Sequence, residues 1–200
     1  MAEATAAAHA DEHHYTSTGL PSWKVGFWTF IGSECLFFAS LISTYMVYKG
    51  ASVSGPTPAE ILNIPLTSVS TFVLLMSSLS MVLALDAVQK GNRKGALLWL
   101  GGVILLGSLF LAGQAYEFTD FVHEGLTIQE NLFGSSFFVL TGFHGAHVTV
   151  GVIWMITLWI QGLRGKLPPE NALQVEVAGL YWHFVDIVWI VIFTLVYLIQ

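Results

Sequence analysis

Six ionisable side chains stand inside long apolar stretches of this 200-residue sequence, where a charged group is costly and needs a partner. They are Glu34, Glu117, His144, His147, His183 and Asp186. The two histidines near residue 145 are three residues apart, as are His183 and Asp186, so each pair would share one face of a helix. Such groups could bind a metal or haem, relay protons, or pair with one another to fix helix packing.

The spacing of these groups separates the three interpretations. A metal or haem site would need a pair of Glu-x-x-His helices, histidines matched across two helices, or a thiolate, and none of these patterns occurs. A proton relay would need groups that reach both membrane surfaces, which these do not obviously do. The pattern favours buried carboxylate and imidazole pairs that order the helices and contact a partner subunit. Buried pairs specify geometry better than they stabilise it.

The elements that must carry these residues are membrane-spanning helices. Over half of the residues are hydrophobic (54%) and only 10% are charged, too few to cover a soluble core of this size. A hydrocarbon layer about 30 Å thick needs roughly 20 apolar residues of helix. Five such runs predict an all-α bundle within residues 23–200, after a flexible polar tail at residues 1–22. The predicted spans are 26–48, 66–88, 95–118, 135–161 and 178–199.

The distribution of basic residues orients the predicted bundle. Six lysines and arginines fall on the side of the tail and of the second and fourth loops, and only Lys49 falls on the other side. Because basic residues accumulate in cytoplasmic loops, the amino terminus is predicted inside and the carboxyl terminus outside. The net charge of −6 argues against nucleic acid as a partner, and the single Cys35 excludes an internal disulfide.

Helical rise then predicts which polar residues meet. Glu34, His183 and Asp186 fall at similar depth and are expected to form an inner cluster. An outer cluster would contain Glu117, Gln114 and His144, with His147 between the two.

Small and hydroxylated residues predict where helices pack, since lipid supplies no hydrophobic force between them. The fourth run carries Gly142 and Ala146 one turn apart, with Gly145 and Thr149 beside them. The second run is rich in serine and threonine, which favours close packing and bonds back to helix carbonyls over a polar conduit.

Several sequence blocks resemble subunit III of the haem–copper terminal oxidases, in the short five-helix form found in bacteria. The blocks are GFWTFIGSECLFF in the first run, GQAYEF at the end of the third, ENLFGSSFFVLTGFHGAHVTVG into the fourth, and GLYWHFVDIVW in the fifth. Their order and spacing are similar to the family from residue 23 to residue 200. The GFHGAHV and YWHFVD segments are the most specific.

The resemblance implies a subunit of a proton-pumping respiratory oxidase in the bacterial plasma membrane, with no redox centre of its own. Haem and copper would belong to partner subunits, and the main contact would be oxidase subunit I. The subunit would stabilise that partner, sustain its proton uptake and hold phospholipid. Glu34 matches the family's buried carboxylate, the usual target of hydrophobic carbodiimides, and the other five ionisable residues match its polar interior. The electron donor, cytochrome c or quinol, stays open, and the alternative is a membrane b-type cytochrome-like protein that binds its own cofactor.

The sequence also departs from the longer form of the family. Two leading helices are absent, and with them one wall of the lipid-filled cleft that they frame in that form. The tail that replaces them contains His9, His13 and His14, which could collect protons at the inner surface. Its small-residue composition favours a disordered end instead.

Overall fold

The computed structural model describes residues 19, 22–50, 62–129 and 131–199, and these residues are helical apart from short turns. The elements are α2 (Ser22–Tyr48), α4 (Ile64–Gln89), α5 (Arg93–His123), α6 (Leu132–Leu163), the 3₁₀ helix η1 (Pro169–Asn171), α7 (Ala172–Ile192) and the π-helix η2 (Phe193–Leu198). Five segments are long and apolar enough to cross a membrane, counting η1, α7 and η2 as one. The predicted all-α fold with five spans is therefore confirmed. The tail histidines lie outside the described residues, and the predicted tail boundary and orientation stay predictions.

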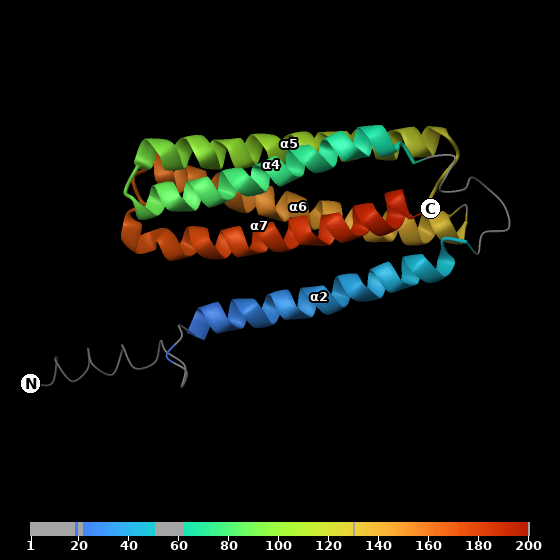
Figure 1. Ribbon diagram of the computed structural model, residues 1–200, viewed down its shortest axis with the longest axis horizontal. Helices are drawn as coiled ribbons and strands as arrows, with labels where there is room; N and C mark the ends of the chain where they lie inside the picture. Colours follow the sequence, from blue (N-terminus) through green and yellow to red (C-terminus); the bar gives the residue numbers. More distant parts are fainter. Residues whose placement is uncertain (1–18, 20–21, 51–61, 130, 200) are drawn as a thin grey trace, which may run out of the picture. The chain divides into compact units, whose positions relative to one another are not determined.

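The chain divides into two compact units, Met1–Phe37 and Phe38–Gln200, and the boundary falls within α2. In the second unit, α4 packs against α5 and α7, and α6 packs against the same two helices. Figure 1 shows these four helices running along a common direction as one bundle. α7 is the most enclosed of the spans, with 56% of its most apolar window buried, against 33% or less for each of the others.

Asparagines begin three of the helices. Because the first N–H groups of a helix have no partner within it, a side-chain oxygen at the N-cap stabilises the start. An asparagine Oδ1 accepts from the backbone N–H three residues later at 3.2, 3.0 and 2.6 Å, before α4, α5 and α6 respectively. The caps are Asn63, Asn92 and Asn131.

Glycines end the same three helices. Each adopts a positive φ directly after the C-cap residue, a conformation that glycine enters without a Cβ clash. The next residue donates its N–H back across the last turn, as Asn92 does to the carbonyl of Ala87 at 2.8 Å. The three glycines are Gly91 (φ 68°), Gly125 (φ 89°) and Gly165 (φ 71°).

The Trp182 indole of α7 fills the centre of the bundle against two glycines. A Cβ added to Gly107 of α5 would lie 2.7 Å from Trp182 Cη2, and one added to Gly151 of α6 would lie 2.7 Å from Trp182 Cζ3. The predicted contact through Gly142 and Ala146 is wrong for the described bundle, since a Cβ on Gly142 would meet nothing within 4 Å and Ala146 is exposed. The opposite face of α6, at Gly151, packs against the Trp182 indole instead.

We expect Gly151→Ala to destabilise the protein by about 1–3 kcal/mol, because the new methyl group overlaps the Trp182 ring and forces the core apart. Gly142→Ala on the same helix is the matched control. It should leave the free energy of unfolding unchanged or raise it slightly, because alanine favours helix where space is open. Unfolding in mixed micelles measures both, and equal values for the two variants would contradict the packing.

Candidate functional site

A row of hydroxyl groups on α4 forms the polar centre of the bundle. Thr67, Thr71 and Ser78 lie four and seven residues apart, so they share one face of the helix, with Ser77 beside them. Each of the four bonds to a side chain on α5 or α7. Hydroxyls inside lipid otherwise satisfy only their own helix carbonyls, so this row connects α4 to its two neighbours.

Two buried tryptophans of α7 donate to this row. Trp189 Nε1 donates to Thr71 Oγ1 at 2.9 Å, and Trp182 Nε1 donates to Ser77 Oγ at 2.9 Å. Each hydroxyl in turn donates a hydrogen bond to a carbonyl of α4. Thr71 donates to the carbonyl of Thr67 at 2.7 Å, and Ser77 donates to the carbonyl of Leu74 at 2.5 Å. Both indoles are fully buried, so these bonds provide an acceptor for each of the two N–H groups and fix the register between α4 and α7.

Glu117 of α5 occupies the end of the row near the α4 N-terminus. Its side chain is 3% exposed. A hydrogen bond joins Glu117 Oε1 to Thr67 Oγ1 at 2.7 Å, and Gln114 Nε2 donates to Oε2 at 3.2 Å. The hydroxyl of Tyr197 lies beside the carboxyl group, although it makes no hydrogen bond of normal geometry. The structure thus places Glu117 with Gln114, as predicted for the outer cluster, and adds Thr67.

His144 lies in an aromatic enclosure instead of joining Glu117. It is 1% exposed, and neither ring nitrogen has a hydrogen-bond partner among the described residues. Its ring stacks on Trp189 with centroids 4.8 Å apart, and meets the edges of Phe110 and Phe38 at 6.0 and 6.4 Å. The imidazole therefore fills space as an aromatic ring.

His147 makes a local bond on its own helix. Its Nδ1 lies 2.7 Å from the carbonyl oxygen of Phe143, and because a carbonyl only accepts, Nδ1 carries the proton. The ring also packs against Phe38 at 4.9 Å. The backbone carbonyl of His147 accepts from the Tyr181 hydroxyl at 3.0 Å, so this residue connects α6 to α7.

His183 and Asp186 approach α4 from α7. Ser78 Oγ lies 2.6 Å from His183 Nδ1. Asp186 is 3% exposed and lies beside the same serine, but its oxygens have no hydrogen bond of normal geometry within the described chain. His183 thus bonds to Ser78 and not to Asp186. Glu34 is half-buried on α2 in the first unit, so its clustering with these two residues stays a prediction.

The arrangement is suited to joining helices. Within the described ranges, no group of three or more histidine, cysteine, aspartate or glutamate side chains could together hold a metal ion. The polar side chains are instead spread along the bundle, and several of them bond to a hydroxyl or a carbonyl of a neighbouring helix. These are Glu117, Tyr181, Trp182, His183 and Trp189.

Comparison with known proteins identifies this bundle. Residues 3–200 match the family model described as cytochrome c oxidase subunit III. The chain belongs to this family. It is 42% identical over 174 residues to the cytochrome c oxidase subunit 3 of Bacillus sp. (strain PS3), covering 87% of this chain and 84% of that one. It is 37% identical over 198 residues to the cytochrome bo(3) ubiquinol oxidase subunit 3 of Pseudomonas aeruginosa, covering 99% and 94%.

These relatives make the protein a subunit III of a bacterial terminal oxidase, a multi-pass protein of the plasma membrane. The resemblance seen in the sequence is confirmed, and the alternative of a b-type cytochrome-like protein is not favoured. Relatives are named for both cytochrome c and quinol as donor, including a quinol oxidase subunit 3 of Bacillus subtilis at 40% identity over 174 residues, or 87% of this chain and 85% of that one.

Sequence reasoning missed the partners that organise this subunit III, although a signal was present. Thr67 and Thr71 are one turn apart, and Trp182 and Trp189 are two turns apart on a face of α7. A buried indole N–H needs an acceptor, and the threonines and serines of α4 are the acceptors at matching intervals. These tryptophans, threonines and serines are neutral, so the pattern of ionisable residues does not include them.

A double-mutant cycle on Thr71→Val and Trp189→Phe should show a coupling free energy of roughly 0.5–2 kcal/mol, the size measured for hydrogen bonds between membrane helices. The readout is the free energy of unfolding in mixed micelles. Thr157→Val with Trp189→Phe is the control pair, because Thr157 bonds only to the carbonyl of Trp154 on its own helix. Additive effects at the Thr71 pair would contradict the assigned bond.

Proposed function

We propose that this subunit III supports the catalytic subunit I of a proton-pumping respiratory oxidase, without performing redox chemistry itself. Subunit I would hold the haem and copper that reduce oxygen, with electrons from cytochrome c or quinol. The present chain would be its main neighbour, stabilising it, sustaining its proton uptake and holding lipid against it. The hydrogen-bonded row on α4 is the observation that carries the proposal, because it commits polar side chains to holding helices together.

Glu34 has a separate role in this proposal. It is half-buried in α2, within an apolar stretch that contains no other acidic residue between Ser22 and Tyr48. A carboxyl group within a membrane-spanning helix is costly unless it is paired. We expect its partner to be an imidazole of the fourth or fifth span, so that Glu34 fixes the first span and, through it, the junction with subunit I.

Replacing Glu34 by alanine should loosen subunit III from the oxidase or hasten inactivation during turnover, with the haem absorption spectrum unchanged. Retention of the subunit and the decline of oxygen consumption with time are the two measurements. Glu124→Ala, at an exposed helix end, is the control and should behave as wild type. Loss of haem from the assembled Glu34→Ala oxidase would count against a purely supporting role.

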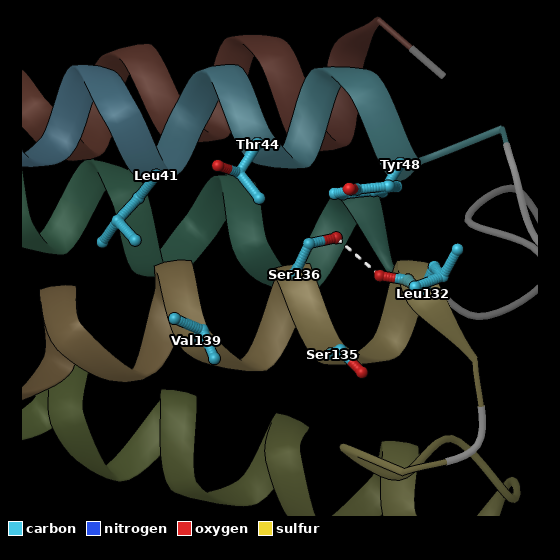
Figure 2. A pocket seen from close by; sticks show the side chains of 7 residues that line it. All are labelled: Leu41, Thr44, Tyr48, Leu132, Ser135, Ser136 and Val139. Carbon is cyan, nitrogen blue, oxygen red and sulfur yellow. Dashed lines mark hydrogen bonds between the residues drawn. The ribbon is translucent and has the colours of Figure 1, made fainter.

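An apolar groove supports the lipid part of the proposal. It lies between the second half of α2 and α6, encloses about 210 Å³, and is lined by Leu41, Thr44, Tyr48, Leu132, Ser135, Ser136 and Val139 (Figure 2). Its serine and threonine hydroxyls donate to backbone carbonyls, such as Thr44 to Ser40 at 2.8 Å and Ser136 to Leu132 at 2.8 Å. The walls therefore offer hydrocarbon surface, which suits a phospholipid acyl chain.

Filling the groove should lower the phospholipid content of the purified oxidase. Val139→Trp places a large ring among the lining residues, whereas Val150→Trp, at a 56% exposed position of α6 away from the groove, is the matched control. Mass spectrometry of lipids extracted after delipidating washes measures the difference. Equal lipid content in both variants would place the lipid elsewhere.

A further inference from the structure

The hydroxyl of Thr67 faces two oxygen atoms at hydrogen-bonding distance. The carbonyl oxygen of Asn63, one turn earlier on α4, lies 2.9 Å from Thr67 Oγ1, and Glu117 Oε1 lies 2.7 Å from it. A threonine hydroxyl has one proton to donate and two lone pairs that accept. It cannot make a full bond to two acceptors, so if it donates to Asn63, the proton in the other bond must come from Glu117.

The same helix shows which arrangement its hydroxyls adopt. Thr71 and Ser77 each lie near a carbonyl of α4 and near a side chain of α7. In both cases the α7 partner is an indole N–H, which only donates. The hydroxyl must therefore accept from the neighbouring helix and give its own proton to its own helix. Thr67 has the same geometry, with Glu117 in the place of the indole.

The surroundings of Glu117 suit a neutral carboxyl group. The side chain is 3% exposed, and among the described residues no lysine, arginine or histidine pairs with it. Its other oxygen, Oε2, accepts from Gln114 Nε2 at 3.2 Å. The remaining ionisable groups that face it are the hydroxyl of Tyr197 from η2 and the carboxylate of Asp120, and neither would balance a negative charge.

We propose that Glu117 is a proton-binding site inside the bundle, held as a carboxylic acid. Oε1 carries the proton and donates it to Thr67 Oγ1, Thr67 donates to the carbonyl of Asn63, and Oε2 is the carbonyl oxygen that accepts from Gln114. In this series of three hydrogen bonds, each donated proton then has one acceptor. All of these hydrogen bonds lie within α4, its N-cap residue and α5. The proposed proton site therefore does not depend on the supporting function proposed above, and it goes beyond that function.

Infrared difference spectroscopy on the intact oxidase tests the assignment, since a carboxylic acid and a carboxylate have separate C=O bands. Subtracting the spectrum of Glu117→Gln from that of the wild type should leave a carboxylic acid band that shifts in D₂O. Glu124→Gln, which removes an exposed carboxylate, should leave only carboxylate bands. Loss of a carboxylate band in Glu117→Gln, with no change in the carboxylic acid region, would overturn the proposal.

The role of Thr67 is tested in the same spectra. Thr67→Val removes the acceptor and should move the Glu117 carboxylic acid band, whereas Thr67→Ser keeps the hydroxyl and should restore its position. Thr71→Val, one turn along α4 and bonded to Trp189, is the control and should leave the band in place. An unmoved band in Thr67→Val would show that Glu117 does not donate to this hydroxyl.

Discussion

The pairing of polar groups within lipid is the constraint on which this structure depends. Hydrocarbon offers no water to an exposed hydroxyl or indole, so each must find its partner inside the protein. The α4 helix meets this requirement in two steps. Its serines and threonines give their protons to carbonyls of their own helix, as Thr71 and Ser77 do. Their lone pairs then accept from neighbouring helices, and these acceptor positions fix the register of α7 along α4.

Trp182 connects this constraint to packing. Its N–H bonds to Ser77 of α4, while its six-membered ring enters the space left by Gly107 of α5 and Gly151 of α6. One side chain therefore contacts the three other helices of the bundle, and it belongs to the most buried of the spans. Membrane helices gain little from hydrophobic burial, so association rests on close van der Waals contact and a few directed bonds. A large ring opposite two glycines supplies both.

The sequence was sufficient to predict the fold, and less so the site. Apolar runs of the required length predicted the five spans, because hydrocarbon thickness sets helix length directly. Residues that share a helix face were not each other's partners, because the sequence of one helix does not show which side chains of the next helix lie opposite. His183 was expected to cluster with Asp186, but its ring bonds to Ser78 of α4. Small residues of α6 do mark a helix contact, as predicted, but the contact is at Gly151 and not at Gly142. Glycines occur on several faces of α6, and among them only Gly151 lies against aromatic rings.

The two histidines of α6 show two ways in which this interior accommodates an imidazole. His147 donates its Nδ1–H to the Phe143 carbonyl of its own helix. His144 has its ring between Trp189, Phe110 and Phe38, and neither of its nitrogens has a hydrogen-bond partner among the described residues. Aromatic stacking holds His144 by its faces and edges, which places the imidazole among hydrophobic side chains as one more packed ring. The described interior of this subunit III thus contains an ionisable residue, His144, that is packed as a core side chain.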